Sequence, residues 1–345
     1  MKKTLIALAA VAATGAAFAQ SSVTLDGVVE LGLVRPAAND NSTRLDAANG
    51  ASQIRFRGTE DLGGGLKANF VLAQRLSLES GGNDGSANGR PTFQGESTVG
   101  LSGGFGSLKI GRALTALQGP VNATDPWGTL QQATTAILPS GYYTEPTGSL
   151  DGSGLGRTDA IFYNSPNFSG FSFAANFGPK FSGTNPAAVQ TANTENFMSL
   201  YGSYAAGPLV VGAGFEQNRR DDSITFVHAI YDFGFVRIGG GFAKVEAGAA
   251  VPAGPAGALL ANEEANNWNI MAIAPLGPVT LKVGYGESEN DTTNTDRSKK
   301  LGIGLDYPLS KRTSINANFA RTSADAAAAG YAKRTAYEVG LRHTF

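Results

Sequence analysis

Three arginine side chains fall on the polar side of short alternating apolar runs. Arg55 and Arg57 lie in "QIRFRG", where they alternate with Ile54 and Phe56, and Arg75 ends "GLKANFVLAQR". A guanidinium group is always charged and attracts anions, and the attraction is stronger where low-dielectric walls surround a polar compartment. These residues therefore predict a positively charged wall beside a water-filled space.

Other site chemistries have little support in the sequence. The chain has no cysteine and only two histidines, His228 and His343, neither of which lies near a recognisable nucleophile motif. A hydrolase would need a base beside its nucleophile, and a thiolate metal site would need cysteines. "DLGGGLK" lacks the spacing and setting of a phosphate-binding loop and is interpreted as a tight turn. We therefore expect no enzyme, no cofactor and no metal site.

The elements that must position the arginines are strands. "VTLDGVVELGL" places Val23, Leu25 and Leu33 on one side and Asp26 and Glu30 on the other, and this period of two recurs along most of the chain. The 46 glycines among 345 residues are about twice the usual frequency of roughly 7%. Each predicted strand thus has one apolar face and one polar or glycine-containing face.

The connections distinguish a membrane barrel from a water-soluble sandwich. Short turns alternate with longer polar connections, which are residues 36–51, 78–93, 113–155, 178–195, 246–264, 287–297 and 323–333. Aromatic residues cluster beside the short turns, as expected for a girdle at a membrane interface. About sixteen alternating runs predict an all-β fold, a 16-stranded antiparallel transmembrane β-barrel over residues 20–345. The terminal "YEVGLRHTF" keeps its alternation up to Phe345, so we expect the last strand to pair with the first.

The first 19 residues have the layout of a secretory signal peptide: Lys2 and Lys3, an apolar run, and small residues ending at Ala19. Without Lys2 and Lys3, 25 of the 27 basic residues remain against 28 acidic residues. That balance gives no reason to expect a nucleic acid as a partner.

Four stretches carry a resemblance to a known family: "IRFRGTEDLGGGLKANFVLAQ", "GLSGGFGSLKIGRALT", "RTDAIFYNSPNFSGFSFAANF" and the terminal "YEVGLRHTF". Over essentially the whole mature chain, the sequence resembles the trimeric sixteen-stranded general porins of Gram-negative outer membranes. The resemblance implies passive diffusion of small hydrophilic solutes, a homotrimer in outer-membrane lipid and lipopolysaccharide, and a third outer loop that folds into each pore. It also implies that the barrel-assembly machinery reads Phe345 as part of an insertion signal.

The loop expected to narrow the pore is residues 113–155, which follow "KIGR". Its acids are Asp125, Glu145 and Asp151. In the family pattern, basic wall residues face such acids, and the wall candidates here are Arg55, Arg57, Arg75, Arg112 and Arg157. Strict alternation puts Arg112 and Arg157 in phase with apolar neighbours, and for these two the prediction depends on the resemblance. More arginines than loop acids predict a modest anion preference.

Two other functions remain open from the sequence. One is a substrate-specific channel for an organic acid, a phosphate or a sugar, which would need a lysine-rich constriction or an aromatic slide, and neither is evident. The other is a plugged structural or adhesive barrel that presents loops such as "AGAAVPAGPAGALLANEE". Ala, Gly and Pro offer little specific chemistry for recognition. General diffusion is the main hypothesis.

Overall fold

The computed structural model of the protein describes residues 22–36, 42–46, 52–83, 92–128, 133–135, 156–179, 195–219, 221–248, 251–254, 257–259, 262–292, 295–323 and 334–345. The expected signal peptide, residues 1–19, lies outside the described residues, and so do the loop acids Glu145 and Asp151.

Among the residues that the structure describes, eighteen strands form one antiparallel sheet, and sixteen of them are long. The long strands are β1 (Ser22–Arg35), β3 (Gln53–Gly63), β4 (Leu66–Ser77), β6 (Glu96–Gly103), β7 (Gly106–Leu114), β8 (Arg157–Asn164), β9 (Phe171–Gly178), β10 (Phe197–Ala206), β11 (Leu209–Gln217), β12 (Ser223–Asp232), β13 (Arg237–Glu246), β16 (Glu264–Leu276), β17 (Val279–Asn290), β18 (Thr295–Pro308), β19 (Thr313–Ser323) and β20 (Arg334–Thr344). The short elements are β2 (Arg44–Asp46), β5 (Gly82–Asn83), the separate ribbon β14 (Val251–Gly254) and β15 (Gly257–Leu259), and the helix α2 (Gln118–Ala123). Within the described residues, no helix is long and apolar enough to span a membrane.

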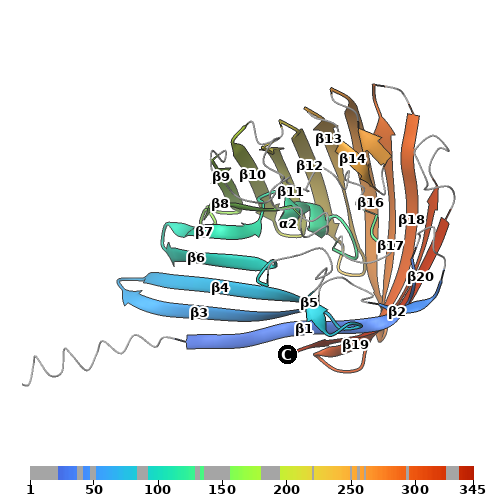
Figure 1. Ribbon diagram of the computed structural model, residues 1–345, viewed down its shortest axis with the longest axis horizontal. Helices are drawn as coiled ribbons and strands as arrows, with labels where there is room; N and C mark the ends of the chain where they lie inside the picture. Colours follow the sequence, from blue (N-terminus) through green and yellow to red (C-terminus); the bar gives the residue numbers. More distant parts are fainter. Residues whose placement is uncertain are drawn as a thin grey trace, which may run out of the picture.

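The sheet closes through its first strand. β1 pairs with β20 along Val28–Arg35 and with β3 along Ser22–Val28, so both neighbours are hydrogen-bonded to it. Gly27 and Phe345 exchange two backbone hydrogen bonds of 3.1 Å, and the C-terminus lies beside β1 (Figure 1). The predicted closed barrel of sixteen antiparallel strands is confirmed, and the alternation at the C-terminus belongs to its closing strand.

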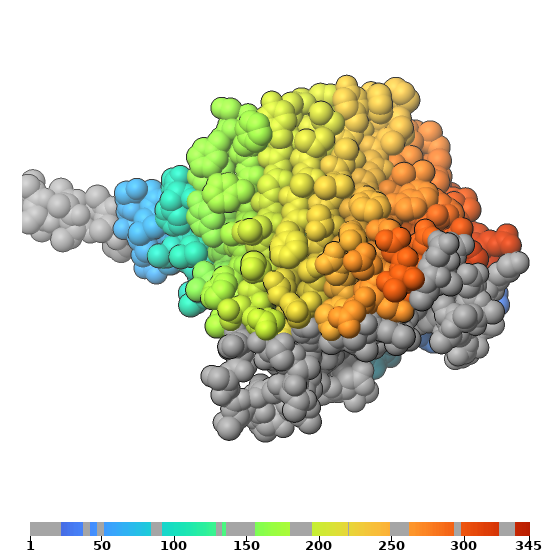
Figure 2. All heavy atoms as spheres, turned by 90° about the horizontal axis from the view of Figure 1, so that it is seen from above, coloured from blue at the N-terminus to red at the C-terminus, as the bar shows by residue number. Residues whose placement is uncertain are grey.

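The alternation in the sequence separates the outside of the barrel from its lumen. On β1, Val23 and Leu33 are exposed, whereas Glu30 and Val34, on the other face, are buried. The outer wall around β9 to β17 is seen in Figure 2. The strands of this wall expose apolar side chains such as Phe242 of β13. A contiguous apolar outer surface of this kind needs lipid or another chain to cover it.

The two ends of the barrel differ as predicted. At one end the turns are short. In the β3–β4 turn, Gly63, Gly64 and Gly65 have φ values of 85°, 60° and 81°, which favour glycine because a Cβ is strained there. The strand ends that lead into the longer connections are at the other end. The predicted loop 287–297 is wrong in its bounds: β17 runs to Asn290 and β18 begins at Thr295, because polar side chains continue the strand pairing beyond the apolar band.

Candidate functional site

The chain that follows β7 turns into the barrel. Leu117 and Val121 are buried and pack in one cluster with inward-facing residues of the wall opposite. The wall residues of this cluster are Ile224, Phe226, Ala243, Val245, Ala247 and Ala265. Burying each of the two loop side chains stabilises this position by about 1.5–3 kcal/mol relative to leaving it in water. The predicted inward folding is confirmed for the described part of the loop, which also contains the short helix α2.

A second apolar contact holds the loop farther along the wall. Trp127 is buried with Ala133, Ala320 and Ala336. Its indole Nε1 donates a 2.8 Å hydrogen bond to Oδ1 of Asn318 on β19, so both the ring and its polar atom have partners. The loop is therefore fixed to β19 and β20 as well as to β12, β13 and β16.

Two asparagines of the wall bind the backbone of the loop. Asn269 on β16 donates from Nδ2 to the carbonyl of Thr124 at 2.6 Å. Asn176 on β9 accepts from the backbone N–H of Ala116, also at 2.6 Å. Buried backbone groups away from water need such partners. The asparagine side chains of β9 and β16 thus supply the hydrogen bonds that water would otherwise make to these two backbone groups of the loop.

Glycines on the lumen side of β17 and β18 make room for the loop. A Cβ at Gly302 would lie 2.7 Å from the Trp127 ring, at Gly284 3.0 Å and at Gly304 2.9 Å. All three positions alternate with outward residues such as Ile303. The glycine-containing strand faces predicted from the sequence therefore provide, at Gly284, Gly302 and Gly304, the space that the Trp127 ring occupies.

Asp125 lies in the loop, as the sequence predicts, but only 4% of its surface is exposed. Its carboxylate accepts hydrogen bonds from the Thr134 hydroxyl at 2.7 Å and from the Thr135 backbone N–H at 2.8 Å. Lys300 on β18 interacts electrostatically with Asp125 and with Glu338 on β20. The carboxylate of Asp125 thus joins two parts of the loop beside a cation of the wall.

Arg55 and Arg57 converge on a single acid. Asp26 of β1 accepts from Nε of Arg55 at 2.7 Å on one oxygen and from Nε of Arg57 at 2.6 Å on the other. The Asp26 side chain is 14% exposed, whereas the Arg55 and Arg57 side chains are 38% and 49% exposed. Two guanidinium groups against one carboxylate leave a local excess of one positive charge facing water in the lumen.

The other predicted arginines have different surroundings. Arg75 on β4 is opposite Gln53 in the strand register and is 3% exposed. The Nε atoms of Arg112 and Arg157 donate to the carbonyls of Gln94 and Gly95, at 3.3 Å and 2.7 Å. The structure therefore brings Arg112 and Arg157 together at the segment that leads into β6. Their place in the pore wall, like that of Arg75, stays a prediction.

Several lumen charges lie on strand faces that the alternation marks as polar but are not among the predicted site residues. Lys109 binds Glu96 at 2.7 Å, and Lys282 binds Asp306 at 2.5 Å. Lys300 also belongs to this group. Its position in phase with Gly302 and Gly304 could have placed it on the lumen face of its strand. The Lys109–Glu96 and Lys282–Asp306 pairs each join one cation to one anion, whereas two arginines share Asp26.

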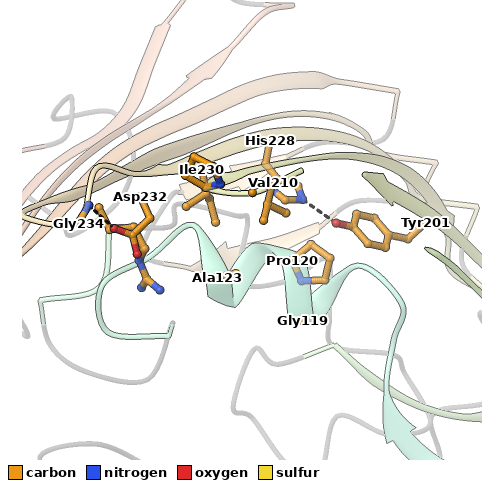
Figure 3. Close-up of a pocket in the computed structure, with 12 residues that line it drawn as sticks. Gly119, Pro120, Ala123, Tyr201, Val210, His228, Ile230, Asp232 and Gly234 are labelled. Atoms are coloured by element: carbon orange, nitrogen blue, oxygen red, sulfur yellow. Dashed lines mark hydrogen bonds between the residues drawn. The ribbon is translucent and has the colours of Figure 1, made fainter. Parts of the chain in front are cut away.

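The two histidines occupy opposite faces of the wall. His228 points into the lumen, is buried, and its Nε2 shares a 2.7 Å hydrogen bond with the Tyr201 hydroxyl (Figure 3). His343 faces outward, in phase with the exposed Leu341, and its Nδ1 lies 2.9 Å from the Thr313 hydroxyl. Neither contact contains the carboxylate that would orient a catalytic base.

Comparisons with known proteins agree with this architecture. The model of the Gram-negative porin family matches residues 4–327. Outer membrane porin protein 32 of Delftia acidovorans is 32% identical over 375 aligned residues, with all of both chains covered. The major outer membrane protein P.IB of Neisseria lactamica is 28% identical, again over all of both chains. The solved structure of the anion-selective porin from Comamonas acidovorans is similar with a TM-score of 0.74 and 26% identity, covering 94% of this chain and 100% of that one. The chain therefore belongs to the Gram-negative porins.

Proposed function

We propose that this outer-membrane porin is a general diffusion channel with a modest preference for anions. Charged groups at the narrow part of a pore act on passing ions more strongly than the net charge of the whole chain does. The observation that carries the proposal is the two-to-one pairing of Arg55 and Arg57 with Asp26, whose guanidinium groups are exposed to the lumen. The transport is passive and includes no chemical step.

The described part of the loop supports a constriction. Its contacts with β9, β16 and β19 hold it across the lumen, so it narrows the space available to a solute. The similarity to an anion-selective porin at 26% identity supports the sign of the preference. We include Arg75, Arg112 and Arg157 in the proposed wall, with Glu145 and Asp151 as further loop acids.

We also propose that the chain forms a homotrimer in outer-membrane lipid and lipopolysaccharide. The resemblance to trimeric porins and the apolar outer wall support this assembly. The backbone pairing of Phe345 with Gly27 is consistent with a terminal residue that the assembly machinery reads before the barrel closes. Gel migration and mass measurement of the unheated protein test the trimer.

A planar-bilayer recording under a salt gradient tests the proposed channel. We expect stepwise conductance increases in potassium chloride and a reversal potential whose sign corresponds to greater chloride permeability. A reversal potential of the opposite sign would overturn the anion preference while keeping the channel. The absence of conductance steps would overturn the channel itself.

A further inference from the structure

A cavity of about 740 Å³ lies between α2 and the short-turn end of β10–β13 (Figure 3). Its lining comes from the loop on one side, with Gly119, Pro120 and Ala123, and from the wall on the other. It is separate from the Arg55–Arg57 pair, which lies on β3. The cavity is large enough for a small organic solute.

One part of the cavity is apolar and aromatic. Pro120 of α2 faces Val210 and Ile230 of the wall, with Tyr201 and His228 beside them (Figure 3). The hydrogen bond between Tyr201 and His228 fixes these two rings relative to each other. An apolar side chain of a solute would lose its contact with water here, which favours its binding.

The other part of the cavity carries two opposite charges. Asp232 and Arg237 are directly opposed on β12 and β13, and both are exposed. One carboxylate oxygen of Asp232 accepts from the backbone N–H of Gly234 at 2.8 Å. Within the part of the chain that the structure describes, no ion pair joins Asp232 to Arg237, and the Arg237 guanidinium has no other ion-pair partner. Both groups can therefore receive a charged ligand.

We propose that this cavity is a subsite for a small zwitterion with an apolar side chain, an α-amino acid of the phenylalanine type. The carboxylate of the solute binds Arg237, its ammonium group binds Asp232, and its side chain lies between Pro120, Val210 and Ile230. A simple organic anion fits less well, because Asp232 repels it. This inference rests on the proposed channel function, since the solute reaches the cavity through the lumen.

Four probe compounds distinguish the proposed contacts with Arg237, with Asp232 and with the apolar part of the cavity. L-Phenylalanine has the carboxylate, the ammonium group and the apolar body. 3-Phenylpropionate lacks the ammonium group, phenethylamine lacks the carboxylate, and glycine lacks the body. Binding is measured by titrating each compound into the purified full-length protein, and as a partial block of the current in bilayers. We expect L-phenylalanine to bind most tightly of the four.

Variants of the wall test the charged contacts. Arg237→Gln and Asp232→Asn should each weaken phenylalanine binding about tenfold or more, since each removes a charge-assisted hydrogen bond. Arg312→Gln is the matched control, because Arg312 is an exposed arginine of a short turn that does not line the cavity. Equal phenylalanine affinity in Arg237→Gln and the wild type would overturn the site, and equal binding of 3-phenylpropionate would overturn the zwitterion.

A cavity-filling variant tests the location without changing any charge. A Cβ at Gly119 would meet nothing within 4 Å, so Gly119→Leu should keep the fold and occupy the cavity. We expect it to abolish phenylalanine binding while conductance steps in potassium chloride persist. Unchanged binding in this variant would overturn the proposal. Because the steps in potassium chloride report the channel separately, a failed subsite and a failed channel give different results.

Discussion

Glu30 of β1 and Arg342 of β20 face each other directly across the strand pair that closes the barrel. Nη1 of Arg342 lies 3.1 Å from Oε2 of Glu30, and the Glu30 side chain is 0% exposed. Asn316 of β19 donates to the other carboxylate oxygen at 2.6 Å. The pair therefore connects the first strand to the last two strands from inside the lumen, where lipid does not reach.

Replacing Arg342 by methionine should destabilise this closure. The change removes the Arg342 cation from the buried Glu30 carboxylate, and a partly exposed partner reduces the cost of losing such a pair to about 1–3 kcal/mol. Urea unfolding of the protein in detergent micelles measures the difference. Arg312→Met, at an exposed turn, should unfold at the same urea concentration as the wild type. Equal midpoints for all three proteins would contradict a stabilising role for the Glu30–Arg342 pair.

Neutralising both arginines on Asp26 should change the ion preference. In the double variant Arg55→Gln/Arg57→Gln, the Asp26 carboxylate remains without its two guanidinium partners, so the local charge changes from one positive to one negative. We expect the reversal potential to move toward cation preference. The single variant Arg57→Gln should give an intermediate value, because Arg55 still neutralises Asp26.

The salt dependence provides an independent check on that result. The Debye length falls from about 10 Å at 0.1 M salt to about 3 Å at 1 M, so the difference between the wild type and the double variant should shrink in concentrated salt. An unchanged reversal potential in the double variant at low salt would show that other charges set the selectivity.

The wall of the barrel was predictable from the sequence because each side chain of a strand faces either the outside of the barrel or its lumen. Val23 and Asp26 differ by an odd number of positions, so one must face outward and the other inward. The same period predicts that Arg55 and Arg57 share the face of Asp26, with which both form ion pairs. The positions where strands begin and end were less predictable. β17 and β18 extend past the apolar band, where polar outward residues no longer mark a strand.

The contacts inside the lumen were predictable only in part. Asp125 was identified as a loop acid, but its hydrogen bonds from Thr134 and Thr135 and its position near Lys300 of the wall arise only when the loop folds into the lumen. The alternation of apolar and polar residues that identifies a strand does not apply to a loop that crosses the lumen. The resemblance supplied its inward direction, whereas the helix α2 and its apolar contacts required the structure.

Trp127 should control how firmly the loop narrows the pore. In Trp127→Ala, the loop loses a buried ring and the hydrogen bond to Asn318, and such truncations cost about 3–5 kcal/mol where the site does not collapse. We expect single-channel conductance to rise. Trp127→Phe keeps most of the packing and loses the hydrogen bond, so its conductance should lie closer to that of the wild type. A conductance unchanged in both variants would show that this segment does not limit the pore.

Gly302, which lies against the Trp127 ring, allows a direct test of why the lumen face of β18 is rich in glycine. In Gly302→Ala, the new methyl group would meet the Ala133 carbonyl oxygen and the Trp127 ring, and overpacking of this kind costs about 1–3 kcal/mol. Gly202→Ala is the matched control, because a Cβ there would meet nothing within 4 Å and neither residue has a positive φ. We expect Gly302→Ala to shift the loop and change the conductance, and Gly202→Ala to leave it unchanged. If both variants conduct like the wild type, the glycines of β18 are not needed to seat the loop, and the alternating glycine pattern would reflect strand geometry alone.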